Sequence, residues 1–220
     1  NAGLAAMKAN KLDKAIKYLS AAAQYGYNGA TIYPVIANVH KERKDTLEAL
    51  KVLKKGFEKF PSDINILSNM IQTYIDLGRK KEALEYLNMA TKQEPSNATF
   101  FLAMGRLYED SGDEEKALNA YQKAIDVDPE LFMAWYNLGV FYYNKGVEQW
   151  EVAGEVPAND NKTYEKELKK AHGWWEKALP FMEKCHEINP NDVNTIESLK
   201  NLYYRLNQME KYKLMVEKSK

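Results

Sequence analysis

The segment ATFFLAMGRLYEDSGDEEKALNAYQKAIDVDPEL, residues 98–131, carries a pattern that recurs along the chain. Its proline, Pro129, follows Pro95 by 34 residues, and Pro95 follows Pro61 by 34 residues. Pro190 comes 61 residues after Pro129, which is one period and 27 further residues. A fixed period of this length is typical of a protein built from stacked structural repeats.

Three other residue types keep the same period. The alanines in the series are Ala15, Ala49, Ala83, Ala117 and, after the 61-residue step, Ala178. The tyrosines are Tyr74, Tyr108, Tyr142 and Tyr203, and the glycines are Gly78, Gly112 and Gly146. Because several copies agree in phase, we interpret the pattern as a repeat array and not as a chance match.

The pattern inside each copy resembles the tetratricopeptide repeat (TPR) family, which has an aromatic residue, Leu-Gly, Tyr, Ala, a second aromatic residue and Pro in order. The best-matching copy contains Phe101, Met104, Gly105, Tyr108, Ala117, Tyr121, Ala124 and Pro129. The next copy contains Trp135, Leu138, Gly139 and Tyr142. The resemblance implies an all-α fold, a right-handed α-solenoid of at least ten helices in antiparallel pairs.

Each residue type has a physical role in a helix-turn-helix unit. Small residues such as Gly105, Gly139 and Ala117 allow two helices to approach closely, while large ones such as Tyr121 and Trp135 fill the space between neighbouring pairs. Proline ends each unit because it cannot continue a helix. We therefore expect Ala117 and Gly139 to be buried at helix crossings.

The resemblance divides residues 1–220 into one continuous TPR array. The predicted repeats are a partial one at 1–29, full ones at 30–63, 64–97 and 98–131, one with an insertion at 132–192, and a C-terminal repeat or cap at 193–220. Since each repeat contacts only its neighbours, we expect one superhelix and not two globular domains. Asn1 falls inside a first helix in this frame, so we expect the chain to be a processed or trimmed piece.

The insertion, at about 147–173, lengthens the turn between the two helices of its repeat. Gly154, Pro157 and the run 158–161 interrupt it in the middle. Apolar residues then recur at helical spacing, namely Tyr164, Leu168, Ala171, Trp175, Leu179 and Met182. We expect a projecting helical hairpin whose second helix is N-capped by Asp160 or Asn161.

A second apolar stripe on the outgoing helix consists of Trp174, Phe181, Cys185 and Ile188. Before Ala171 only one stripe remains, so we expect the hairpin to be free of the next repeat there. The sequence leaves open whether the hairpin has a partner or is a decorative extension. Similar insertions in exported bacterial TPR proteins favour an exported or periplasmic location in a Gram-negative bacterium over a cytoplasmic one, and the location is otherwise undetermined.

The composition excludes several classes of protein. Thirty-one basic and 31 acidic residues give no net charge, which disfavours nucleic acid as a partner. No apolar run approaches the roughly 18 residues that a membrane-spanning helix needs. Cys185 is the only cysteine and occupies a small-residue position of a second helix, which indicates packing and not reactivity.

Motifs for catalysis, cofactors and metals are missing from the sequence. It has no Gly-rich phosphate loop, no Gly-x-Ser-x-Gly, no His-Glu-x-x-His and no Cys-x-x-Cys. His172 and His186 lie about four helical turns apart, roughly 20 Å, which is too far to hold one metal ion. We therefore predict a noncatalytic protein without cofactor or metal.

The resemblance implies binding to a protein or peptide in a concave groove lined by the first helices. The family's groove-facing positions give the predicted ligand-binding residues Asn38, Asn69, Gln72, Arg106, Tyr136, Asn137, Tyr143, Asn201, Tyr204 and Arg205. The same projection also includes Lys41, Asn65, Ser68, Asp76, Leu102, Glu109, Asp110, Met133, Asn194 and Glu197. Amides can pair with a peptide backbone and tyrosines add flat contact area, although ordinary soluble surface has the same composition.

A chaperone-type carboxylate clamp is not expected. Its positions, counted from the first full repeat, hold Pro34, Asn38, Asn69, Thr99 and Ala103, so both asparagines are present and all three cations are missing. We predict a scaffold that binds a protein segment in the groove. The alternative is a structural assembly module whose end-to-end packing or hairpin mediates self-association, and the oligomeric state stays open.

Overall fold

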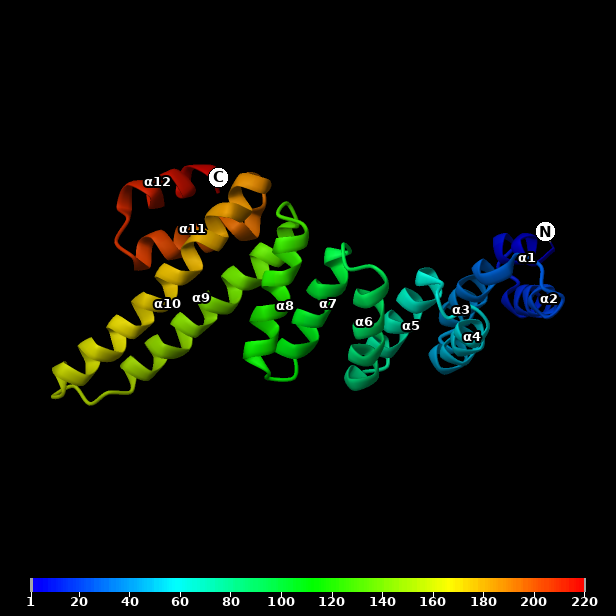
Figure 1. Ribbon diagram of the computed structural model, residues 1–220. Coiled ribbons are helices and arrows are strands. Elements are labelled where there is room, and N and C mark those ends of the chain that lie inside the picture. Colours follow the sequence, from blue (N-terminus) through cyan, green and yellow to red (C-terminus); the bar gives the residue numbers. More distant parts are fainter. Residues whose placement is uncertain (1, 220) are drawn as a thin grey trace. The chain divides into compact units, whose positions relative to one another are not determined.

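The computed structural model describes residues 2–219, in which the chain forms twelve α-helices, one short 3₁₀ helix and no β-strand (Figure 1). The helices are α1 (Ala2–Lys8), α2 (Leu12–Gln24), η1 (Gly29–Thr31), α3 (Ile32–Glu42), α4 (Thr46–Lys59), α5 (Ile64–Asp76), α6 (Lys80–Gln93), α7 (Ala98–Glu109), α8 (Glu114–Val127), α9 (Phe132–Gly154), α10 (Asn161–Ile188), α11 (Val193–Arg205) and α12 (Met209–Lys218). The predicted all-α fold is confirmed.

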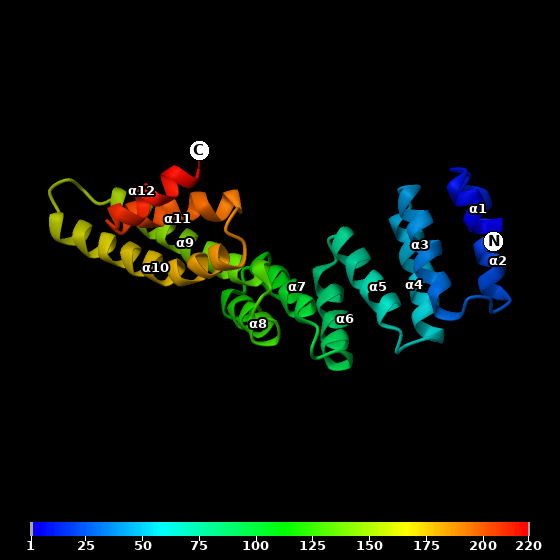
Figure 2. The same cartoon turned by 90° about the horizontal axis from the view of Figure 1, so that it is seen from above.

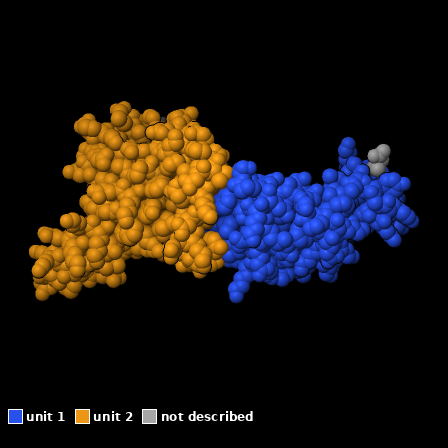
Figure 3. Space-filling view, viewed as in Figure 1, with its two compact units in different colours: residues 1–107 blue, residues 108–220 orange. Residues whose placement is uncertain are grey.

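The chain divides into two compact units, Asn1–Leu107 and Tyr108–Lys220 (Figure 3). The first unit contains α1 to α6 and most of α7, and the second contains α8 to α12. Their boundary falls inside the predicted repeat 98–131. The single array expected from the sequence spans both units and stays a prediction.

In the first unit, successive helices pack as pairs, α1 with α2, α3 with α4 and α5 with α6, and neighbouring pairs pack in turn (Figure 2). Short turns join the members of a pair, so the two helices are antiparallel. The periodic residues Ala15, Ala49 and Ala83 have no exposed surface, because the partner helix covers them. Large side chains between the pairs, such as Leu67 and Met70, complete the core.

Recurring polar residues and glycines determine where these helices begin and end. Four helices begin at an aspartate whose carboxylate accepts a hydrogen bond from a backbone N–H in the first turn, namely Asp63, Asp113, Asp160 and Asp192. The predicted N-cap at Asp160 is thereby confirmed. Gly78 and Gly112, each two or three residues after a helix end, have φ of +68° and +75°, a left-handed conformation that glycine adopts without strain.

In the second unit, α9 and α10 pack side by side along their length and extend beyond the helices around them (Figure 1). They have 23 and 28 residues, and residues 147–173 form their far ends and the connection between them. Gly139 and Ala117 are buried, as predicted. A Cβ on Gly139 would lie 2.8 Å from Cε of Met182 on α10, so the glycine is what permits this crossing.

Gly146 provides a second close crossing of α9 and α10, and we predict that Gly146→Ala destabilises the protein. The new Cβ would lie 2.2 Å from Nε1 of Trp175, whose side chain is only 1% exposed, so the ring or one of the two helices must shift. We expect the free energy of unfolding in urea, followed by circular dichroism, to fall by about 1–3 kcal/mol.

Gly173→Ala is the matched control, because a Cβ at this position in α10 would meet nothing within 4 Å. There the better helix propensity of alanine should raise the free energy of unfolding by about 0.5–1 kcal/mol. Changes of the same sign in both variants would contradict the packing of Trp175 against Gly146.

Cys185 is fully buried, and we predict that its thiol is inert in the folded protein. Burial raises the pKa of Cys185 to about 12, and its Sγ lies 3.9 Å from the backbone oxygen of Phe132. At pH 8 roughly one thiol in ten thousand would then be a thiolate, the reactive form. A disulfide reagent such as DTNB should release its chromophore only after urea unfolds the chain, and fast reaction of the native protein would contradict the burial of this helix face.

Candidate functional site

The predicted ligand-binding residues lie on the first helices of the pairs, and each unit carries its own set. In the first unit, Asn38 lies on α3, Asn69 and Gln72 lie on α5, and Arg106 lies on α7. Asn38, Gln72 and Arg106 are exposed, and Asn69 is half-buried. These side chains are therefore accessible to a ligand.

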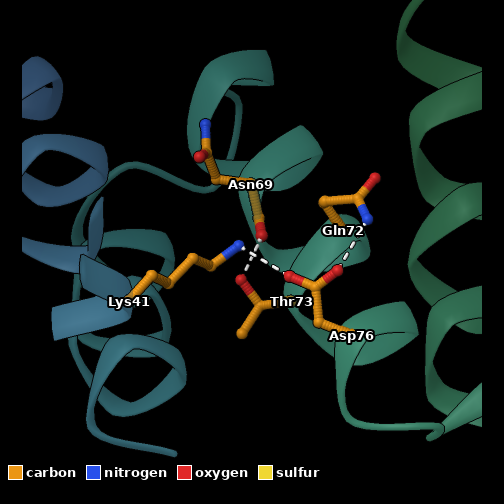
Figure 4. Close-up of polar contacts among 5 residues, drawn as sticks. All are labelled: Lys41, Asn69, Gln72, Thr73 and Asp76. Carbon is orange, nitrogen blue, oxygen red and sulfur yellow. Dashed lines mark hydrogen bonds and ion pairs between the residues drawn. The ribbon is translucent and has the colours of Figure 1, made fainter. Parts of the chain in front are cut away.

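A polar network connects α3 to α5 on this face (Figure 4). Lys41 Nζ lies 3.1 Å from Asp76 Oδ2, and Gln72 Nε2 donates a hydrogen bond of 2.8 Å to Asp76 Oδ1. Both carboxylate oxygens of Asp76 thus accept from a side chain, one on each helix. The structure therefore brings together Lys41, Gln72 and Asp76, three of the positions predicted to face the groove.

Asn69 lies on the same face but bonds within its own helix (Figure 4). Its Nδ2 donates to the backbone oxygen of Asn65 at 2.8 Å, and Thr73 Oγ1 donates to the backbone oxygen of Asn69 at 2.6 Å. The side-chain oxygen of Asn69 makes no hydrogen bond to a described residue, nor does the amide of Asn38. Both amides thus retain hydrogen-bonding capacity for a ligand.

In the second unit, the predicted residues Tyr136, Asn137 and Tyr143 lie on α9. Tyr136 and Tyr143 are half-buried and pack against the core around Trp175. The ring of Tyr136 stacks on Phe132 at 5.8 Å between centroids, and burial raises the pKa of its hydroxyl. These two tyrosines therefore contribute to the stability of the second unit, whether or not they also contact a ligand.

The remaining predicted residues, Asn201, Tyr204 and Arg205, lie on α11. Asn201 is exposed, and the ring of Tyr204 is 63% exposed and 5.6 Å from that of Tyr212. The guanidinium of Arg205 lies over one ring of α10 and one ring of α9. Its Cζ is 4.5 Å from the ring centroid of Trp175 and 5.2 Å from that of Trp150.

A cavity of about 400 Å³ lies around Arg205, between the hairpin and the α11–α12 turn, and we call it the Arg205 pocket. Its lining residues are Trp150, Leu168, His172, Trp175, Tyr204, Arg205, Asn207 and Met209. The projection of groove positions identified only Tyr204 and Arg205 among them. The sequence signal for the other lining residues was the set of aromatic and apolar residues in the insertion. The sequence analysis assigned these residues to helix packing alone.

The expectation that the hairpin is free of the next repeat before Ala171 is wrong. Leu168 lines the same cavity as Met209, and Trp150 lies against Arg205 of α11. The expectation counted only apolar stripes, and this contact is made by a charged side chain whose guanidinium stacks on an aromatic ring.

Residues 2–219 contain neither a cluster of metal ligands nor a membrane-spanning helix. Within residues 2–219, no group of three or more His, Cys, Asp or Glu side chains is placed to hold a metal ion. None of the helices in this range combines the length and the apolar character that crossing a membrane requires. Burial lowers the pKa of both His40 and His186, which lie in different units.

Comparisons with known proteins identify the repeat. A tetratricopeptide repeat family model matches residues 41–107, and a TPR repeat model matches residues 105–146. No curated protein sequence matches the chain.

Solved structures of TPR proteins share the fold. MamA is 20% identical, with a TM-score of 0.64 and coverage of 87% of this chain and 90% of MamA. A tetratricopeptide repeat protein from Parabacteroides merdae is 16% identical, with a TM-score of 0.63 and coverage of 98% and 75%. YrrB is 17% identical, with a TM-score of 0.60 and coverage of 91% and 90%. Residues 41–146 of the chain thus carry matched tetratricopeptide repeats, and its all-α helix pairs have the fold of TPR proteins.

Proposed function

We propose that the chain is a noncatalytic protein-protein interaction scaffold that binds an extended protein segment on the polar face of α3 and α5. The observation that carries this proposal is the cluster of accessible amides, Asn38, Asn69 and Gln72, beside the Lys41–Asp76 pair (Figure 4). The TPR fold supports interaction with proteins in general.

The chemistry of this face suits a peptide backbone. A side-chain amide has both donors and an acceptor, as does each peptide unit of an extended chain. The contacts with Asp76 hold Lys41 and Gln72 in place before any ligand arrives, which lowers the entropy lost on binding. Since Lys41 and Asp76 are both partly exposed, their ion pair contributes at most about 1 kcal/mol, so a ligand can replace it at little cost.

Two further observations support the proposal. YrrB, one of the structures that share the fold, is a TPR protein with an unusual peptide-binding site. In the present chain the one nucleophilic thiol, Cys185, is buried and is thus unsuited to covalent catalysis. Binding accounts for the accessible polar groups on α3 and α5 more simply than a reaction does.

The test is a triple variant, Asn38→Ala, Asn69→Ala and Gln72→Ala. Peptides would first be selected from a display library on the immobilised wild-type chain, and their affinities measured by fluorescence polarisation. Each lost hydrogen bond contributes about 0.5–1.5 kcal/mol, so the triple variant should bind at least about tenfold more weakly. Its melting temperature should hardly change, because none of the three side chains is in the core.

A matched control carries Asn88→Ala, Asn119→Ala and Gln122→Ala, which likewise remove two asparagines and one glutamine, from exposed positions on the second helices α6 and α8. It should bind the selected peptides like the wild type. Equal loss in both variants, or no loss in the first, would remove the α3–α5 face as the binding site.

A second candidate function is self-assembly through the hairpin, which is favoured by three exposed apolar residues near its end, Trp150, Val152 and Tyr164. Size-exclusion chromatography with light scattering would compare the wild type with the double variant Val152→Lys and Tyr164→Lys. This function predicts a wild-type oligomer that the two lysines dissociate. A wild-type monomer at the highest soluble concentration would rule it out.

A further inference from the structure

We propose that the Arg205 pocket binds an acidic side chain of the protein segment that the scaffold recognises, with an apolar neighbour of that side chain filling the rest of the cavity. The inference rests on the proposed scaffold function and adds to it a second contact, contained within the second unit. Its evidence comes from the orientation of Arg205, from the charges around it and from the lining of the cavity.

The two tryptophans hold the guanidinium of Arg205 in a defined position. Trp175 is almost completely buried and therefore rigid, and the guanidinium lies 4.5 Å from its ring centroid. Trp150, on α9, adds a second ring at 5.2 Å. Contact with a ring face occupies none of the N–H donors of a guanidinium, whose forked arrangement matches the two oxygens of a carboxylate.

Arg205 lacks the counter-ion that neighbouring cations have. Lys200, on the same helix, is paired with Glu197 at 2.5 Å, and Lys211 is paired with Glu183 at 2.9 Å. Arg205 makes no ion pair with any residue in the range 2–219, although it is half-buried. A partly buried cation without a carboxylate is complementary to an anionic group supplied from outside the chain.

The lining of the pocket has no carboxylate of its own. Glu165 and Glu176 line a neighbouring cavity on α10, together with Lys169, and this cavity shares Leu168 and His172 with the Arg205 pocket. The Arg205 pocket is instead lined by rings and apolar side chains, together with the polar side chains of His172, Tyr204, Asn207 and Arg205 itself. A negative group would therefore meet a cation and no carboxylate in the lining of the pocket.

The size and lining of the cavity favour a peptide over a free inorganic anion. Its volume of about 400 Å³ lies in the range of small-ligand sites and far exceeds the space that one carboxylate group occupies. Leu168, Met209 and Trp150 supply apolar surface beside the guanidinium. An Asp or Glu followed by an aliphatic or aromatic residue fits both parts, so we name an acidic peptide as the occupant.

The experiment uses the full chain and the peptides that it selects from a display library. The selected peptides should be enriched in Asp or Glu next to an apolar residue. For one such peptide, a synthetic copy with Asn or Gln in place of each Asp or Glu should bind the wild type at least tenfold more weakly. Arg205→Met should bind both versions equally, because the group that distinguishes them is gone.

Lys177→Met is the matched control. Lys177 also lies over a tryptophan of the same unit, 4.4 Å from the centroid of Trp174, but neither residue lines the Arg205 pocket. It should keep the full preference for the acidic peptide. Arg205→Lys preserves the charge without the fork and should retain part of the preference, and it replaces Arg205→Met as the test variant if circular dichroism shows that the methionine variant is unfolded.

Three results would overturn the inference. They are equal binding of the acidic and amide peptides to the wild type, full preference in Arg205→Met, or displacement of the acidic peptide by inorganic phosphate as effectively as by unlabelled peptide. If peptides bind the wild type and only the triple variant on α3 and α5 lowers their affinity, the scaffold function is supported and the proposal for the Arg205 pocket is rejected. If the library yields no peptide, both proposals fall.

Discussion

The α3–α4 and α9–α10 pairs depend on one steric constraint, namely that one helix offers its backbone, without a Cβ, to a side chain of the other. Gly56 receives Tyr33, Gly139 receives Met182 and Gly146 receives Trp175. A Cβ at any of these glycines would lie less than 3.0 Å from the facing side chain, closer than real contacts allow. Trp150 on α9 and Trp175 on α10 both lie under Arg205 of α11, so their common position depends on the close approach of α9 and α10.

Much of the fold could be predicted because this constraint appears directly in the sequence. Small residues and prolines at a fixed period identify helix pairs without any knowledge of tertiary contacts, and Asp160 marks the start of a long helix by its capping chemistry. The limit of the hairpin's contacts was not predictable in the same way. It depends on the rotamer of one long side chain, Arg205, which lies over Trp150. The position of its backbone is compatible with several rotamers.

In the candidate site too, the positions of the residues could be predicted from the sequence, and their side-chain contacts could not. The repeat frame identifies Lys41, Gln72 and Asp76 as residues of one face, and the structure adds that Asp76 bonds to both of the others. The partner of a side chain on a neighbouring helix depends on the distance and the crossing angle between the two helices. Neither quantity can be read from the sequence around one residue. For this reason the Arg205 pocket, built from four helices and a turn, could not be assembled from the pattern alone.

The long pairing of α9 with α10 restricts how this chain can change in length during evolution. Each added residue turns a helix by about 100°, so a single insertion in α9 beyond Gly146 would rotate Trp150 away from α11. Insertions of about seven residues, close to two turns, return the side chains to nearly the same direction. Related chains should therefore differ in this region by paired steps of about two turns in both helices, and single-residue gaps should concentrate in the connection at residues 155–160.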